Sequence, residues 1–313
     1  MIRQSLCGCY LLTERRRIME TIAEPVTMNF TSRPSALYTL WKGFWSGGKK
    51  FVNNTKLPAL GISWQDIEID RQHLAAFNEV CDSGSGDDCN LLYPYTWIYA
   101  CNLRILSHKS IPLSIFKMLN VGSKTTLYRR IGTDDVLNLH CAISDQRFVS
   151  RGLEVDLTSR IESENDLVWE NTNTFYFRGY SGDNDSNYKP VKFDSLPESY
   201  EEKQWFLPAR NGFRFARIMG DSNGIHYSPR YARMMGFKRD FAHPVMVLAK
   251  CIDLLTQERE DASVKLDVLF KGPLYYGKNI TLKFGGDGRN TRFEVYCQGN
   301  GRPCIKGALY PLK

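Results

Sequence analysis

The sequence predicts an α+β protein built from two similar halves. Two segments, 95–106 and 244–256, are apolar on nearly every side, which is typical of helices buried in a core. Strand-like segments, in which apolar and polar residues alternate, follow each helix in groups of four. They span 125–131, 136–148, 153–161 and 168–178 in the first half, and 264–270, 280–284, 291–297 and 305–310 in the second. This repeated order predicts a pseudo-twofold unit, in which one chain supplies what two identical chains supply in a dimer.

The first half begins with two further elements. Alternating apolar residues from Ile62 to Ile69 predict a strand ahead of the apolar helix. Asp70 is a suitable N-cap for a helix that runs through Leu74 to Val80. A strand and a helix therefore precede the buried helix of this half.

Changes in composition divide the chain into four parts. Residues 1–56 are of mixed composition and form an N-terminal extension. Residues 57–182 form the first half, and residues 207–313 form the second. The intervening residues 183–206 are polar and are predicted to be a linker.

Composition excludes several classes of protein. The chain has 313 residues, of which 42% are hydrophobic and 12% aromatic, enough for packed cores rather than disorder. No apolar run reaches the roughly 18–20 residues that span a bilayer, so we expect a soluble protein. Nine cysteines without paired spacing favour reduced thiols and a cytoplasmic location. Cys7 and Cys9 form the one close pair, and no partner pair completes a metal site.

The net charge of +7 is concentrated at the start of the chain. Residues 1–50 hold eight Lys or Arg against three Glu, which accounts for five of the seven charges. A basic segment of this kind is more often a solvated surface than a reader of bases, so we expect no nucleic-acid partner. The excess still favours an anionic partner. Arg15, Arg16 and Arg17 precede Met19, which leaves Met1 and Met19 as alternative starts.

The residues most suited to chemistry lie just before a well-marked short helix. Ser228 is a good N-cap, Pro229 fits the first helical position, and Gly236 fits the left-handed position after the last turn. Asp221 and His226 lie in the loop ahead of this helix. A carboxylate and an imidazole held at one place can move protons to and from a substrate. Because an Asp before a helix is usually a cap and a lone His is usually structural, this spacing alone leaves both roles open.

The other histidines are weaker candidates. His73, His108 and His140 have no carboxylate partner nearby in the sequence, so we expect them to be structural. His243 directly precedes the second apolar helix, where we expect it to cap or orient the helix start.

Around Asp221 and His226 the sequence resembles a known family. Residues 220–226 read G-D-S-N-G-I-H, and residues 242–246 read A-H-P-V-M. Both are similar to motifs of the MaoC-like acyl dehydratases and (R)-specific enoyl hydratases of the hot-dog fold. Segments 91–94, 151–155 and 169–171 resemble landmarks of the two-domain members of this family. The resemblance therefore covers most of the chain from about Leu57 onward.

This resemblance implies a double hot-dog fold, in which a curved antiparallel sheet wraps around a central apolar helix in each half. It implies a lyase that interconverts (R)-3-hydroxyacyl and trans-2-enoyl thioesters in fatty-acid metabolism. Asp221 and His226 would be catalytic, while Gly220 and Asn223 would hold the loop. The substrate would carry coenzyme A or an acyl carrier protein, and the latter would also be a partner. Neither a metal nor a redox cofactor would be needed, and the chain would act as a monomeric pseudo-dimer or a homodimer.

The first half lacks the motif, so we expect it to shape an acyl tunnel without catalysing. The tunnel would run beside the helix that begins at Pro244. Tyr93, Pro94 and Trp97 would either line this tunnel or pack in the core.

Pro244 is the main departure from the family pattern. It stands where the family has a glycine whose backbone N–H donates to the thioester carbonyl, and proline has no N–H. The N–H of Val245 is the candidate replacement. Gly224, where the family has proline, would loosen the catalytic loop.

These departures keep a second reading open: a catalytically impaired hot-dog protein that binds acyl thioesters or a protein partner. A third reading is nucleic-acid binding through the basic residues of 1–50.

Overall fold

The computed structural model describes residues 26–35, 51–84, 88–186, 188–221, 223–256, 263–286 and 290–312. Cys7, Cys9, Met19 and most of the basic residues of 1–50 lie outside these ranges. The seven cysteines of the described part are all free and buried. In these ranges no helix combines the length and hydropathy needed to cross a bilayer.

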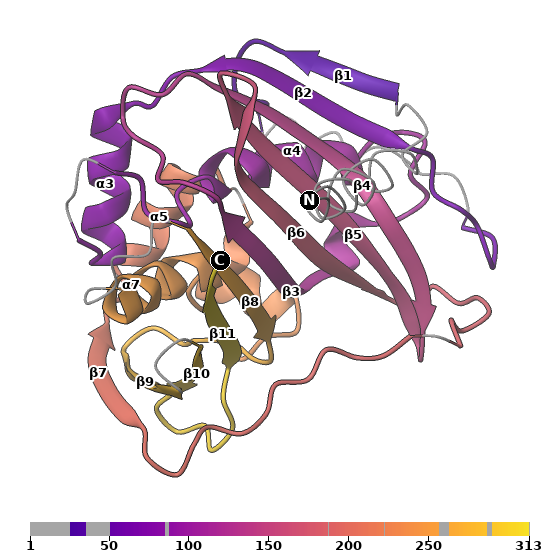
Figure 1. The fold of residues 1–313 in the computed structure, drawn as a ribbon. Helices are drawn as coiled ribbons and strands as arrows, with labels where there is room; N and C mark the ends of the chain where they lie inside the picture. The colour runs from indigo at the N-terminus through magenta and orange to yellow at the C-terminus, as the bar shows by residue number, and fades with distance from the viewer. Residues whose placement is uncertain are drawn as a thin grey trace, which may run out of the picture.

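One continuous sheet of eleven strands forms the body of the described part (Figure 1). The first half contributes β1 (Val26–Phe30), β2 (Leu60–Ile67), β3 (Met118–Leu127), β4 (Leu137–Val149), β5 (Gly152–Ser163) and β6 (Asp166–Arg178). The second contributes β7 (Glu201–Leu207), β8 (Val264–Phe270), β9 (Lys278–Gly286), β10 (Thr291–Cys297) and β11 (Ile305–Pro311). The strand order is β1-β2-β4-β5-β6-β3-β8-β11-β10-β9-β7.

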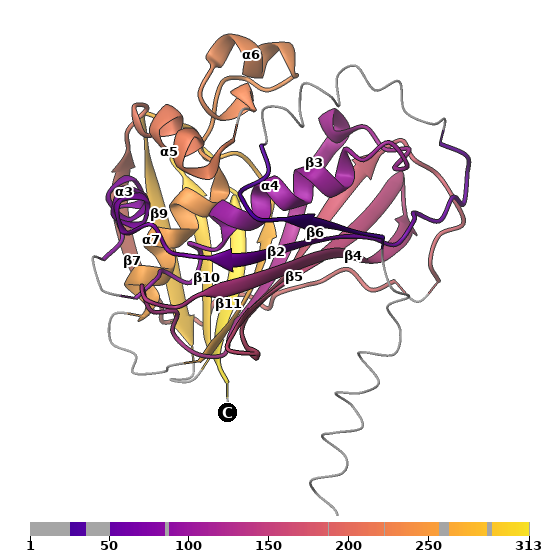
Figure 2. The ribbon, with the colours of Figure 1, turned by 90° about the horizontal axis from the view of Figure 1, so that it is seen from above.

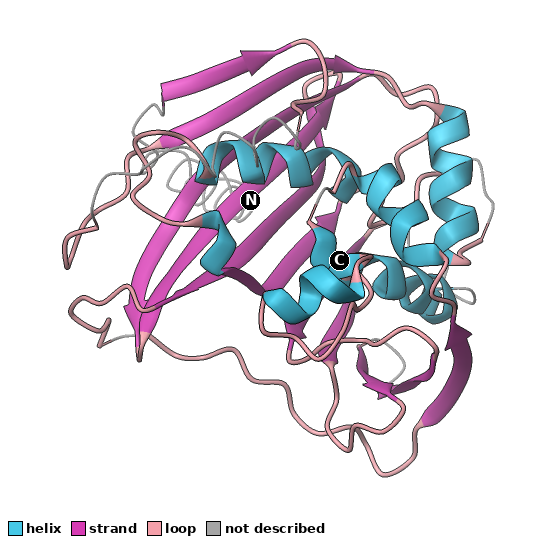
Figure 3. Ribbon diagram, turned by 180° about the vertical axis from the view of Figure 1, so that it is seen from behind, coloured by secondary structure: helices cyan, strands magenta, loops and turns pink. Residues whose placement is uncertain are grey.

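Five α-helices and two short 3₁₀ helices complete the described fold. They are α3 (Arg71–Cys81), α4 (Tyr95–Leu106), η1 (Ile115–Lys117), α5 (Asn211–Met219), η2 (Gly224–His226), α6 (Pro229–Met234) and α7 (Pro244–Thr256). Figures 2 and 3 show α3, α4, α5 and α7 on one face of the curved sheet, with α6 set furthest from it.

The two halves have the same topology, as the sequence predicts. From its outer edge inward, the first half runs β2-β4-β5-β6-β3 and the second runs β7-β9-β10-β11-β8. The halves meet where β3 pairs antiparallel with β8, from Gly122 opposite Leu269 to Leu127 opposite Val264. Because β3 and β8 occupy equivalent places, their antiparallel pairing gives the pseudo-twofold relation.

The two apolar helices occupy the centres of the halves. Helix α4 covers the predicted 95–106, and ten of its twelve residues are buried. Helix α7 covers the predicted 244–256, and its buried residues likewise lie on several sides. Such helices are stabilised by removing their apolar surface from water on all faces.

The landmark segments of the first half meet in its core. The indole N–H of Trp169 donates to the carbonyl of Leu91 at 3.0 Å. The Asn171 side chain donates to the Tyr95 hydroxyl and to Thr125 Oγ1, both at 2.9 Å. Buried polar groups that are bonded in this way specify one packing arrangement. These segments therefore build the core of this half.

Three predicted boundaries differ from the structure. The strand predicted at 125–131 is β3, which begins earlier and spans Met118–Leu127. The last residues of the predicted linker, from Glu201 onward, belong to β7, which pairs with β9. The predicted extension contains β1, which pairs in parallel with β2. Helix α5 was not predicted: its N-cap, Arg210, makes no side-chain capping bond, although Phe215, Ala216 and Met219 are buried at helical spacing.

Candidate active site

Two helices hold the loop that carries Asp221 and His226. Gly220 ends α5 in the left-handed region, at a φ of +66°, which turns the chain sharply into the loop. Ser228 caps α6 as predicted, because its Oγ accepts the N–H of Tyr231 at 3.3 Å. Gly236, at a φ of +89°, follows the last turn of this helix.

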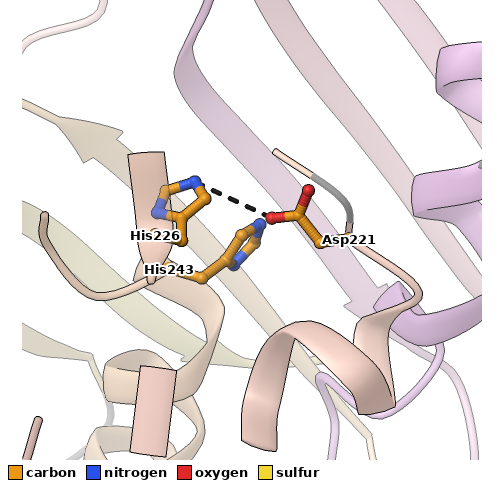
Figure 4. A group of neighbouring side chains, drawn as sticks. All are labelled: Asp221, His226 and His243. Atoms are coloured by element: carbon orange, nitrogen blue, oxygen red, sulfur yellow. Dashed lines mark ion pairs between the residues drawn. The ribbon is translucent and has the colours of Figure 1, made fainter. Parts of the chain in front are cut away.

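Asp221 and His226 converge at one point. His226 Nε2 lies 3.9 Å from Asp221 Oδ2, and both side chains are buried (Figure 4). The other ring nitrogen, Nδ1, lies 3.1 Å from the carbonyl of Phe241. Since a carbonyl only accepts, Nδ1 carries the hydrogen, and Nε2 of the neutral ring faces Asp221 with a lone pair.

The two oxygens of Asp221 have different surroundings. Oδ1 accepts the hydroxyl of Tyr99 and the backbone N–H of Asn223, the latter at 2.8 Å. Oδ2 is buried and has no hydrogen-bond partner among the described residues. One oxygen therefore fixes the carboxyl group, and the other is left for a reactant. Tyr99 comes from α4 in the first half, and no local pattern in the sequence relates it to Asp221.

Burial shifts the protonation of both groups toward their neutral forms. It raises the pKa of Asp221 above its usual range, an effect that His226, Tyr99 and Asn223 oppose. It lowers the pKa of His226, an effect that Asp221 and the bond to Phe241 oppose. Both shifts favour a neutral carboxyl group beside a neutral imidazole.

Arg33 from the N-terminal segment and His73 from α3 contact the end of the helix that precedes the loop. The Arg33 guanidinium donates to the carbonyls of Ile218, Met219 and Thr96, with nitrogen–oxygen distances to Ile218 of 3.2 and 3.3 Å. The Ile218 carbonyl also lies 2.9 Å from Nε2 of His73. A cation at the C-terminal carbonyls of α5 is favoured by the helix dipole. These contacts hold the end of α5 directly before Gly220 and Asp221.

The start of α7 carries His243, Pro244 and Val245. The N–H of Val245 donates to Nδ1 of His243 at 3.3 Å, so His243 caps this helix as the sequence predicts. The predicted oxyanion donor, Val245, therefore already has an acceptor, and Pro244 has no N–H to offer.

Gly224 does not loosen the loop. It is buried, and a Cβ atom at this position would lie 2.9 Å from ring carbons of Tyr231. Close packing accounts for glycine here.

Asp221, His226 and His243 each place one potential ligand atom within 4.8 Å of the others (Figure 4). Metal–ligand bonds of about 2.1 Å at a tetrahedral angle separate ligands by roughly 3.4 Å. Asp221 Oδ2 and His226 Nε2 are 3.9 Å apart, about 0.5 Å more than this separation. The three side chains thus offer one carboxylate oxygen and two imidazole nitrogens around one point.

A cavity of about 1280 Å³ opens beside these residues. Both halves line it: the first with Tyr95, Ile98, Tyr99, Asn102, Leu103, residues 115–121, Asn173, Phe175 and Arg178, the second with residues 223–228, Tyr231, Met235, Phe237, residues 241–245 and 270–274. Tyr93 and Trp97 lie in the core of the first half instead. His226 and His243 line the cavity. Asp221 is not among the lining residues, but its Oδ2 lies 3.9 Å from Nε2 of His226.

Known proteins share both the sequence pattern and the fold. The 3-hydroxyacyl-thioester dehydratase X of Mycobacterium tuberculosis is 25% identical over 245 residues, which are 78% of this chain and 86% of that protein. The crystal structure of HtdX from the same organism covers 80% of this chain and 100% of its own, with 20% identity and a TM-score of 0.68. A MaoC-like dehydratase from Phytophthora capsici gives a TM-score of 0.67 at 14% identity, covering 82% of this chain and 96% of its own. No model of a protein family matches the chain.

The chain is similar in sequence to a 3-hydroxyacyl-thioester dehydratase and shares its fold with MaoC-like dehydratases. The shared architecture extends over both halves, which confirms the predicted double hot-dog fold. In this MaoC-like protein, the motif residues Gly220, Asp221, Asn223 and His226 all gather in the loop between α5 and α6.

Proposed function

We propose that this MaoC-like protein is a hydro-lyase that interconverts (R)-3-hydroxyacyl and trans-2-enoyl thioesters. The observation that carries the proposal is the placement of Asp221 Oδ2 and His226 Nε2, 3.9 Å apart beside a large cavity. An oxygen about 2.8 Å from each atom would lie roughly 2 Å off the line that joins them. The two groups can therefore hold one oxygen, either the 3-hydroxyl of a hydroxyacyl group or the water that adds to an enoyl group. Because Oδ2 is buried, that oxygen must displace neighbouring atoms to reach it.

The protonation of the pair suggests a division of labour. In dehydration, His226 Nε2 takes the C2 hydrogen, and the electrons of that C–H bond form the new double bond. Asp221, whose pKa burial raises, gives its proton to the 3-hydroxyl, and the C3–O bond breaks to release water. Return of the proton from His226 to Asp221 restores the pair. Hydration follows the same steps in reverse.

The cavity supports a thioester as the substrate. Its volume of about 1280 Å³ is large enough for an extended acyl chain. Lys117, Arg178 and Lys271 lie on its lining and suit an anionic carrier. Coenzyme A and an acyl carrier protein both meet this description. The proposed reaction uses neither a metal nor a redox cofactor.

The second candidate is a catalytically impaired protein that binds thioesters without turning them over. Pro244 and the occupied N–H of Val245 favour it, because both reduce the backbone donors at the start of α7. The two candidates differ in whether the protein turns over an enoyl thioester that it binds.

The test is hydration of crotonyl-CoA and longer trans-2-enoyl-CoA thioesters, followed by loss of the enoyl absorbance. Asp221→Asn should lower kcat by about 10²- to 10⁴-fold, the usual contribution of a positioned acid or base. Asp134→Asn is the matched control, because this carboxylate is 94% exposed and pairs with Arg71 on the surface. Tight binding of these thioesters with no turnover at any chain length would instead favour the binder.

A further inference from the structure

A thioester that loses its C2 proton develops negative charge on its carbonyl oxygen. Such charge requires a hydrogen-bond donor aimed at it, and one donor commonly contributes a hundredfold or more in rate. The wall beside His226 includes the start of α7, where a helix normally offers unpaired backbone N–H groups. In this chain Pro244 has no N–H, and the N–H of Val245 donates to Nδ1 of His243.

The same hydrogen bond determines the tautomer of His243. Nδ1 accepts the Val245 N–H at 3.3 Å, so Nδ1 carries a lone pair. In the neutral imidazole the hydrogen is then on Nε2. His226 has the opposite tautomer, because its Nδ1 donates to the carbonyl of Phe241. Two neighbouring imidazoles therefore present a lone pair and an N–H.

His243 is placed to use this N–H on a reactant. Its ring centroid lies 5.0 Å from that of His226, and it lines the same cavity. One ring nitrogen of His243, one of His226 and one carboxylate oxygen of Asp221 lie within 4.8 Å of one another, and Figure 4 shows the three side chains converging. Burial, reinforced by His226, holds the pKa of His243 well below its usual range. The ring is therefore a neutral donor at neutral pH.

On the basis of the proposed function, we propose that His243 is a further catalytic residue, whose Nε2–H donates to the thioester oxygen as the enolate forms. The side chain thereby replaces the backbone donors that Pro244 and the bonded Val245 do not supply. A neutral imidazole can stabilise an enolate in this way because it donates a hydrogen bond without giving up the proton.

Two conservative variants separate this role from helix capping. In His243→Gln, the side-chain Nε2–H occupies nearly the place of the imidazole Nε2–H. In His243→Asn, the side-chain oxygen occupies nearly the place of Nδ1 and can still accept the Val245 N–H. The two variants are compared with wild type in steady-state hydration of a trans-2-enoyl-CoA, and thermal melting reports the folded state of each.

If His243 is the donor, the Asn variant loses about a hundredfold or more in kcat, with little change in KM, and the Gln variant retains clearly more activity. Asn activity equal to or above that of Gln overturns the proposal, since capping alone would then explain the residue. Pro244→Gly is a second probe, because it restores a backbone N–H at the helix start. It should raise kcat more in the Asn background than in wild type, and an equal effect in both contradicts the proposal. Failure of wild type to hydrate any enoyl thioester would refute the proposed function itself.

Discussion

Removing the hydroxyl of Tyr99 tests how the first half contributes to catalysis. Tyr99→Phe keeps the ring on α4 and deletes only the O–H that donates to Asp221 Oδ1. Burial, reinforced by Asp221, raises the pKa of Tyr99 well above its usual range, so the phenol remains a donor throughout the assay range. Asn223 N–H then remains as the partner of Oδ1 in the variant.

The size of the effect follows from the charge on the acceptor. A hydrogen bond to a charged group contributes about 1.5–3 kcal/mol, and its loss corresponds to roughly 1–2 pH units. The bond favours the ionised carboxylate, so its loss raises the pKa of Asp221 further. In our mechanism dehydration requires a protonated Asp221 and a neutral His226. The alkaline limb of the pH–rate profile, which reports loss of the Asp221 proton, should therefore move to higher pH.

The assay is kcat for dehydration of an (R)-3-hydroxyacyl-CoA, followed by the gain of enoyl absorbance and measured across the pH range for wild type and Tyr99→Phe. Tyr176→Phe is the matched control, because that hydroxyl donates to the carbonyl of Arg151 at 3.0 Å on an exposed part of β6. An alkaline limb that stays in place, or moves to lower pH, would refute the assigned roles. Because the two groups are coupled, the limbs report the pair rather than either residue alone.

Two further predictions concern the supports of the site. Arg33→Met should lower the free energy of unfolding by about 2–3 kcal/mol, because it removes charge-assisted hydrogen bonds to the buried residues Thr96 and Met219. Arg33→Lys should fall between this variant and wild type. Exposed Arg302→Met should change stability by less than about 0.5 kcal/mol in denaturant titrations. An equal effect of the Met substitutions at both arginines would show that the contacts of Arg33 are unimportant. The second prediction is that stability falls as the pH drops below 6.5, since three histidines have lowered pKa values in the folded chain and take up protons more readily when unfolded. They are His73, His226 and His243. Each contributes a slope of at most about 1.4 kcal/mol per pH unit, and a stability that is flat from pH 7 to pH 5.5 would contradict their burial as neutral groups.

Local patterns predict the parts of this fold that depend on neighbours in the sequence. Helices α4 and α7 have their predicted bounds. Both segments are apolar on nearly every side, and such a segment is stable only when it is buried. The ends of α6 follow from the chemistry of Ser228 and Gly236, which act within one turn of the chain. The loop with Asp221 and His226 was likewise predictable, because a helix follows it directly.

Contacts between distant residues were beyond such patterns. Tyr99 is 122 residues from Asp221, and Arg33 is 186 residues from Met219. Each looks like an ordinary aromatic or basic residue until the fold brings it to the loop. The sequence predicted that His243 caps α7. It did not predict the tautomer of His243, which depends on the bond from the Val245 N–H. Sequence therefore predicted the loop that carries Asp221 and His226, and missed Tyr99 and Arg33, which reach this region from distant parts of the chain.

Isotope exchange from water tests the central claim most directly. Incubation of a 3-hydroxyacyl-CoA with the protein in H₂¹⁸O, followed by mass spectrometry, measures the addition of water at C3. Our account predicts protein-dependent entry of ¹⁸O into the 3-hydroxyl group, slowed by about 10²- to 10⁴-fold in Asp221→Asn and in His226→Gln. Exchange at the wild-type rate in either variant, or no exchange in the wild-type protein, would contradict it.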